Sequence, residues 1–237
     1  MLSIKNINKT IKGKNIVKNI SFEVPSGCIN GLLGPNGAGK TTTFYIIAGL
    51  IKANSGDILL NNTNVSNYAM HKRSKMGIKY LPQEPSIFQN LTVYENLLGL
   101  AELSFNNKED IKNFIDKSIE EFNLSEILNS KGRQLSGGQR RKVEITRTLA
   151  ADPKIILLDE PFAGIDPIAI DDIKKVLLKL KNKNIGILIT DHNVREALEI
   201  CDHAIVINNG SIIAKGDKDS LVKDENVKKV YLGNMYS

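Results

Sequence analysis

The sequence has no tryptophan and only two cysteines, Cys28 and Cys201. The two cysteines lie far apart in the chain, neither belongs to a CxxC or Cys/His pattern, and both have apolar neighbours. We therefore expect two buried free thiols. The scarcity of cysteine argues against a disulfide-stabilised fold and against a cysteine-ligated metal centre.

Long apolar runs are also missing. No stretch approaches the roughly 20 apolar residues that a membrane-spanning helix needs, and the N-terminus has no signal-peptide pattern. We expect a protein that is cytoplasmic when unassembled and reaches a membrane only through partners. The 237 residues fit one large domain. The net charge of +6 is spread over many short stretches and does not by itself indicate nucleic acid as a partner.

Residues 34–41 form a complete G-x-x-x-x-G-K-[ST] phosphate loop between an apolar run and a helix-like segment, the context that this motif requires. Its glycines let backbone N–H groups face a polyphosphate, and the following helix N-terminus adds partial positive charge. Lys40 is expected to reach the β- and γ-phosphates of ATP, and the Thr41 hydroxyl to coordinate Mg²⁺. The residues expected to contact the nucleotide here are Gly34, Pro35, Asn36, Gly37, Ala38, Gly39, Lys40, Thr41 and Thr42.

An apolar run at 155–158 ends in two carboxylates, Asp159 and Glu160. At the end of a buried strand, Asp159 would hold Mg²⁺ directly or through water, and Glu160 would polarise the water that attacks the γ-phosphate. The alternative is an acidic strand end that caps the next helix. His192 follows a second apolar run, where its imidazole could donate to the γ-phosphate, although a lone histidine there is usually a surface or core residue.

A second anion-binding helix start is predicted at Ser136, Gly137, Gly138 and Gln139. Ser136 is a good N-cap, and the two glycines expose backbone N–H groups. Two phosphate-binding helix ends so far apart in one chain make sense if one of them serves the nucleotide of a second copy.

Hydrophobic periodicity gives the remaining organisation. Alternating polarity predicts antiparallel strands over residues 2–24 with a break near 12–14, and another strand of this group at 58–60. The apolar runs at 155–159 and 185–190, with a helical pattern between them, predict a parallel sheet. We also expect a mainly helical region at 84–151, a hairpin at 204–213 and one short, exposed helix at 220–232.

In this order, the motifs resemble those of the ABC-type ATPases over essentially the whole chain. The resemblance includes Gln83 in a Pro-Gln-Glu segment and the Ala-Gly-Ile-Asp segment at 163–166. It implies an α/β P-loop NTPase fold of ABC type: a mainly parallel sheet core with an antiparallel β subdomain and an inserted helical subdomain. We expect a single domain over 1–237, in which 1–83 and 152–237 form the core and 84–151 carries the signature motif.

The resemblance also implies a mechanism. Two copies sandwich two ATP molecules, each held by one phosphate loop and by the signature residues 136–139 of the other copy. Gln83 senses the γ-phosphate and Mg²⁺, and Ile165 and Asp166 lie at the dimer seam. The implied catalytic residues are Glu160, His192 and Gln83. The implied metal ligands are Thr41, Gln83 and Asp159. One departure is Ile11, which stands where the family usually has an aromatic residue that stacks on adenine.

Five segments resemble more narrowly the ATPases of lipopolysaccharide exporters: 80–88, 91–97, 158–167, 189–196 and 230–233. Such an ATPase works at the cytoplasmic face of the inner membrane as a homodimer docked on two transmembrane permease subunits. Branched-chain amino-acid importers are the nearest alternative, because they share the seam segment and sometimes the tail. A soluble nucleic-acid- or ribosome-associated ABC ATPase is more remote, because those proteins usually carry two ATPase units or a long inserted coiled coil.

The permease subunits are expected to dock near Phe88, Leu91, Val93 and Tyr94, which would line a groove for a short coupling helix. The alternative is that these four side chains belong to the core of the helical subdomain.

Overall fold

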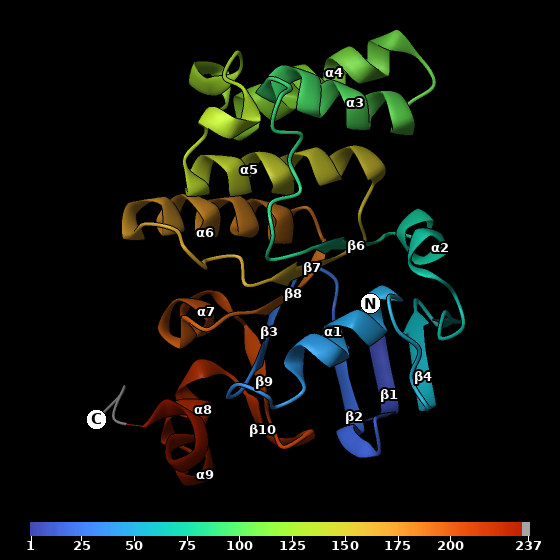
Figure 1. Cartoon of the computed structure of the whole chain (residues 1–237). Helices are drawn as coiled ribbons and strands as arrows, with labels where there is room; N and C mark the ends of the chain where they lie inside the picture. Colours follow the sequence, from blue (N-terminus) through green and yellow to red (C-terminus); the bar gives the residue numbers. More distant parts are fainter. Residues whose placement is uncertain (234–237) are drawn as a thin grey trace.

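A computed structural model describes residues 1–233, and within them the strands form two sheets (Figure 1). The smaller sheet is antiparallel in the order β2-β1-β4-β5. Its strands are β1 (Leu2–Ile11), β2 (Lys14–Val24), β4 (Ser55–Leu60) and β5 (Thr63–Asn64). The first two strands form a hairpin around Lys12 and Gly13, both at positive φ, which confirms the predicted break. The pairing of β4 with β1 confirms the strand predicted at 58–60.

The larger sheet has the order β10-β9-β3-β8-β7-β6. Its strands are β3 (Ile29–Leu33), β6 (Ile78–Leu81), β7 (Ile155–Asp159), β8 (Gly186–Thr190), β9 (His203–Asn208) and β10 (Ser211–Gly216). Neighbouring strands are parallel except β10, which forms the predicted hairpin with β9. The adjacent β7 and β8 confirm the parallel pair expected from their spacing. The sequence patterns did not predict β6, because this strand has only four residues, all of which pair with β7.

Helices cover both faces of this larger sheet (Figure 1). On one face lies α1 (Lys40–Ala48), which packs between the two sheets. On the other face α6 (Pro167–Asn182) lies closest, followed by α5 (Gly137–Thr148) and then α3 (Val93–Ser104) and α4 (Lys108–Glu121). Shorter helices are α2 (Met70–Lys75) and α7 (Val194–Ile200), with single 3₁₀ turns at Ser125–Ile127, Gly132–Gln134 and Leu149–Ala151. The region 84–151 is therefore mainly helical, as predicted.

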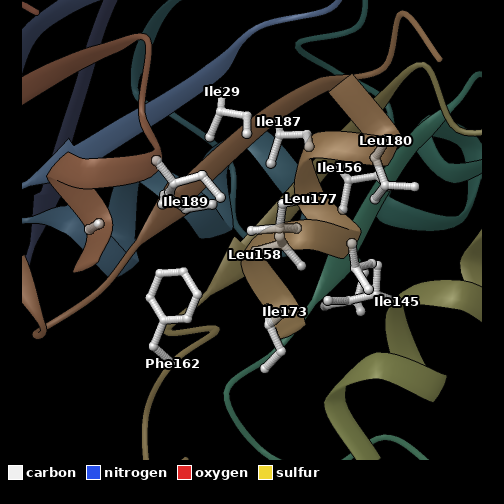
Figure 2. Close-up of a cluster of buried hydrophobic side chains, with 14 of the residues drawn as sticks. Ile29, Ile145, Ile156, Leu158, Phe162, Ile173, Leu177, Leu180, Ile187 and Ile189 are labelled. Carbon is white, nitrogen blue, oxygen red and sulfur yellow. The ribbon is translucent and has the colours of Figure 1, made fainter. Parts of the chain in front are cut away.

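Two apolar clusters form on opposite faces of the larger sheet, because alternate residues of each strand point to opposite sides. Ile156 and Leu158 face Ile173 and Leu177 of α6 (Figure 2). Their neighbours Ile155 and Leu157 belong to the cluster that contains Phe44 of α1. Burial on both faces explains why the parallel strands read as unbroken apolar runs. The candidate site residues at the strand ends therefore extend from a sheet that is packed on both faces.

The predicted single, exposed helix at 220–232 is wrong. The segment forms three short pieces: α8 (Lys218–Lys223), α9 (Glu225–Val227) and a π-helical turn at Lys228–Leu232. Asp224 ends α8 and caps α9, which breaks the helix. Leu221, Val227 and Leu232 are buried against the main cluster, so lysines cover only its outer side. The two cysteines are free, as expected, and both are partly buried. None of the helices in residues 1–233 is long and apolar enough to span a bilayer.

Candidate nucleotide-binding site

The phosphate loop joins β3 to α1 and contains three glycines at positive φ: Gly34, Gly37 and Gly39. Two of these positions admit no side chain. A Cβ on Gly34 would lie 2.0 Å from the carbonyl oxygen of Ile207, and one on Gly39 would lie 2.7 Å from that of Ile16. The loop is thus pressed against β9 and β2, and only glycine allows both the curvature and the close approach.

Lys40 is buried at the start of α1 and curls back into the loop. Its ammonium group donates to the carbonyl oxygens of Gly34 at 2.7 Å and Pro35 at 3.1 Å. Burial lowers the pKa of Lys40, and the nearby carboxylates of Glu160 and Asp159 oppose that effect. A cation is therefore held at the centre of the loop, facing two anionic side chains.

A cavity of about 370 Å³ opens beside this lysine. Its lining comes from the loop, from the first turn of α1 and from the ends of β7 and β8. The lining residues are Ile16, Asn36, Gly37, Gly39, Lys40, Thr41, Thr42, Glu160 and His192. The structure thus brings together the phosphate loop, the second carboxylate and the histidine, although more than 100 residues separate the first from the other two.

The two carboxylates have different surroundings. Asp159, at the end of β7, is 6% exposed, and its Oδ2 accepts a hydrogen bond from the Tyr80 hydroxyl at 3.1 Å. Burial is the main cause that raises the pKa of Asp159. Glu160 lies just beyond the strand at φ +46°, and its Oε1 is 2.6 Å from Nε2 of His192. The parallel register of β7 and β8 places these neighbouring strand ends side by side.

Asp191 holds the segment after β7 and the segment after β8 in place. The sequence analysis did not propose a role for it. Its carboxylate, 1% exposed, accepts hydrogen bonds from the backbone N–H of Phe162 at 2.8 Å and of Asn193 at 2.7 Å. Burial raises the pKa of Asp191, and these two hydrogen bonds oppose the rise. An aspartate directly after an apolar strand is the signal that could have identified it.

The signature segment begins α5 with a reciprocal cap. The Ser136 hydroxyl accepts from the Gln139 N–H at 3.2 Å, and Oε1 of Gln139 accepts from the Ser136 N–H at 3.0 Å. Gly138 also has a packing role, since a Cβ there would lie 2.4 Å from that of Ala169 in α6. Among the described residues, 136–139 contribute nothing to the 370 Å³ cavity. One copy therefore does not bring its own signature segment to its phosphate loop.

Gln83 follows β6 and is exposed. It shares a small hollow of about 60 Å³ with Gly137, Glu160 and Ile165, so it lies near the second carboxylate and not in the main cavity. Oxygen donors such as Thr41, Gln83 and Asp159 suit a hard cation such as Mg²⁺. Residues 1–233 contain no group of three His, Cys, Asp or Glu side chains that could hold a metal alone, so phosphate oxygens would have to complete its coordination.

A buried polar network connects α5 to the segment after β6, and sequence patterns did not indicate it. Arg141, 5% exposed, donates to the carbonyl oxygens of Pro82 at 2.8 Å and Asp159 at 3.1 Å. Glu144 accepts from the N–H groups of Ser86 at 2.6 Å and Ile87 at 3.0 Å. Charged residues one helical turn apart read as a solvated face in the sequence, whereas here they point inward to backbone groups.

The segment held by this network exposes apolar side chains. Phe88, Leu91 and Tyr94 are 53%, 40% and 42% exposed. Val93 is fully buried in the core, so its predicted place in a docking groove is wrong: it is the first residue of α3 and faces inward. Asn96 fixes the backbone of Phe88 by accepting from its N–H at 2.9 Å and donating to its carbonyl oxygen at 3.1 Å.

Comparison with known proteins identifies the family of this chain. A family model described as ABC transporter matches residues 17–163. The lipopolysaccharide export system ATP-binding protein LptB of Haemophilus influenzae is 50% identical over 237 residues, covering 100% of this chain and 98% of that protein. An ATP-binding cassette of an ABC transporter in its ADP conformation is 32% identical, with a TM-score of 0.87 over 98% of both chains. A dimeric cassette in a post-hydrolysis state with ADP and Pi is 25% identical, with a TM-score of 0.79 over 92% of this chain and 99% of that one. The chain belongs to the ABC transporter family of ATP-binding proteins.

Proposed function

We propose that this chain is the ATP-hydrolysing subunit of an ABC transporter that extracts lipopolysaccharide from the inner membrane and drives its export toward the outer membrane. The chemistry rests on one observation: the Lys40 ammonium, the Asp159 and Glu160 carboxylates and the His192 imidazole gather around the phosphate loop. The substrate is inferred from the relative named for lipopolysaccharide export, which is 50% identical to this chain over its full length.

ATP binding uses the loop backbone and Lys40. The N–H groups of the loop surround the phosphates, and Lys40 exchanges its bonds to Gly34 and Pro35 for bonds to phosphate oxygens. Thr41, Asp159 and Gln83 would hold Mg²⁺, which neutralises the charge that develops on the phosphates. The donor set fits this ion, because all three side chains offer oxygen and the phosphates supply the rest.

Hydrolysis requires a water placed in line with the bond between the γ-phosphorus and the bridging oxygen. Glu160 orients this water and accepts its proton, while the leaving oxygen takes the bond electrons to ADP. His192 stabilises the charge on the γ-phosphate, and its contact with Glu160 holds the two side chains together.

A second copy completes the site. The signature segment does not line its own copy's cavity, and a related cassette is dimeric after hydrolysis. We infer that Ser136, Gly137, Gly138 and Gln139 face the nucleotide of the partner copy, with Ile165 and Asp166 at the seam. The reciprocal cap occupies the backbone N–H groups of Ser136 and Gln139 and uses their side chains only as acceptors. The N–H groups of Gly137 and Gly138, the Ser136 hydroxyl hydrogen and the Gln139 amide NH2 are the donors that it leaves available at this helix start.

We propose the same division of the chain as above: a core of 1–83 and 152–237, with 84–151 as a helical subdomain that two transmembrane permease subunits contact at the cytoplasmic face of the membrane. Phe88, Leu91 and Tyr94 are the exposed apolar residues at that contact. Asn96 fixes the backbone at Phe88, so an anchor there would be preorganised for binding.

Phe88→Ala is expected to prevent recovery of the membrane subunits with the ATPase while leaving its unfolding temperature within about 2 °C. The side chain is half exposed, so little core packing is lost. Leu103→Ala is the matched control, because Leu103 is 84% exposed on the same subdomain. Copurification from detergent-solubilised membranes is the measurement, and normal recovery of the Phe88→Ala complex would refute this docking site.

Ile11→Tyr is expected to bind ATP as tightly as the natural chain or up to about tenfold tighter, because a ring at this 39% exposed position could stack on adenine. Titration with fluorescent ATP and GTP analogues measures both affinity and base preference. Ile11→Leu serves as the control that changes shape without adding a ring. A clear loss of ATP affinity in the tyrosine variant would contradict an adenine contact at this position.

Affinity purification of the tagged chain from solubilised membranes, with mass spectrometry of the bound proteins, tests the transport function. Two distinct permease subunits and a periplasm-facing protein with one membrane span are expected. Amino-acid permeases with a solute-binding protein would identify an importer and leave the ATPase chemistry intact. Recovery without any membrane protein would overturn the transporter function.

A further inference from the structure

Tyr80 and Asp159 lie on adjacent parallel strands. Tyr80 of β6 is opposite Leu157 of β7, and Asp159 follows two residues later on the same face of β7. This face carries the cluster that includes α1, the helix that begins at the phosphate loop. The register therefore places the Tyr80 ring beside the strand end that carries Asp159, and the hydroxyl lies 3.1 Å from Oδ2.

The surroundings hold this tyrosine in place. Its ring is partly buried and meets the ring of Tyr45 from α1 edge to face, with 6.2 Å between centroids. Burial is the largest cause that raises the pKa of the Tyr80 hydroxyl far above its ordinary value, and the Asp159 carboxylate adds to it. The Tyr80 hydroxyl is the donor of this hydrogen bond, because an ionised carboxylate can only accept.

Asp159 is also fixed through its backbone, because Arg141 donates to its carbonyl oxygen. With Oδ2 occupied by Tyr80, Oδ1 is the carboxylate oxygen that has no hydrogen-bond donor among residues 1–233. A carboxylate with one oxygen bonded and the other open has a defined orientation toward a ligand. The same short strand leads within three residues to Gln83, another of the proposed metal ligands.

We propose that Tyr80 is a positioning residue for the Mg²⁺ of the nucleotide site: its hydroxyl orients the Asp159 carboxylate so that Oδ1 faces the metal. This inference rests on the proposed function, in which Asp159 is a metal ligand. Tyr80 is not among the residues that line the 370 Å³ cavity, so we expect it to affect the affinity for the metal and to leave the contacts of the phosphate loop unchanged.

The test compares Tyr80→Phe with the natural chain by titrating Mn²⁺ in the presence of ATP and recording free Mn²⁺ by electron paramagnetic resonance. We expect Mn²⁺ to bind about tenfold more weakly to the variant, in the range found when a group that orients a metal ligand is removed. Binding of a fluorescent ATP analogue in EDTA should stay within about twofold. Tyr68→Phe is the matched control, because it removes a hydroxyl from the same side of the molecule without touching Asp159.

A double-mutant cycle separates positioning from a general effect on the fold. In an Asp159→Asn background, Tyr80→Phe should lower the Mn²⁺ affinity by less than about twofold, because the carboxylate that it orients is gone. Equal Mn²⁺ affinity in the natural chain and Tyr80→Phe would overturn the proposal. An equal loss of Mn²⁺ and metal-free nucleotide binding, or of folding, would also overturn it by showing a structural role. Failure of the natural chain to bind ATP with Mn²⁺ would instead refute the proposed function.

Discussion

Glu160→Gln is expected to lower kcat for ATP hydrolysis by at least about a hundredfold while ATP binding and dimer formation persist. Glutamine has nearly the same shape but cannot accept the proton of the attacking water. Glu160 lines the cavity beside Lys40, and its Oε1 contacts His192 at 2.6 Å. The substitution therefore removes the base without removing the groups that hold the phosphates. Phosphate release gives kcat, and gel filtration with ATP reports the dimer.

Glu102→Gln is a suitable control for this variant, because Glu102 is an exposed carboxylate on α3 that lines neither the 370 Å³ cavity nor the hollow beside Gln83. Its kcat should equal that of the natural chain. Near-normal turnover of Glu160→Gln would show that another group orients the water. Loss of ATP binding in that variant would show that Glu160 contributes mainly to nucleotide affinity, for instance through its charge near Lys40.

Arg141→Ala is expected to lower the free energy of unfolding by about 3–5 kcal/mol, the usual cost of removing one partner from a buried charged pair. Arg141 is 5% exposed and lies 3.4 Å from Glu144, which is 2% exposed. Its loss leaves the Glu144 charge buried and two backbone carbonyl oxygens, those of Pro82 and Asp159, without their donor. Urea unfolding followed by circular dichroism is the measurement.

Arg140→Ala provides the comparison, since Arg140 precedes Arg141 on the same helix and its side chain has no hydrogen bond or ion pair among the described residues. A change within about 0.5 kcal/mol is expected for it. Arg141→Lys should fall between the two, because lysine keeps the charge but lacks the planar fork that reaches several acceptors. A loss below about 1 kcal/mol for Arg141→Ala would show that water replaces the guanidinium at these carbonyl groups.

The parts of the site that the sequence predicted are those in which neighbours in the chain act together. The phosphate loop needs glycines at fixed spacing, and Asp159 and Glu160 come at the end of the apolar run that forms the buried strand β7. The hairpins, the parallel pair β7 and β8 and the helical region at 84–151 also follow from local periodicity. Each of these patterns arises within one strand, turn or helix, or from the order of successive elements, so a single sequence contains enough information to reveal it.

The parts that the sequence missed depend on contacts between distant residues. Tyr80 and Asp159 meet only because β6 and β7 pair, and Arg141 is buried only because the segment after β6 passes over α5. In the sequence Val93 cannot be distinguished from its apolar neighbours Leu91 and Tyr94, whereas in the structure its position at the start of α3 directs it into the core. The C-terminal segment looked exposed because its three lysines, Lys223, Lys228 and Lys229, are interspersed with the three apolar residues that anchor it. In each case the sequence shows whether a residue is polar or apolar, but not which distant residues its side chain contacts in the folded chain.

The strand order of the larger sheet has a consequence for synthesis on the ribosome. β3, which carries the phosphate loop, lies between β8 and β9, and it gains both neighbours only after residue 208 has been made. At the usual elongation rate of roughly 5–20 residues per second, its two hydrogen-bonding edges stay unpaired for about 10–35 s. During that time the nascent chain exposes the apolar strand β3 without the neighbouring strands β8 and β9. We therefore expect holdase chaperones to associate with the growing chain and leave only when its last strands emerge.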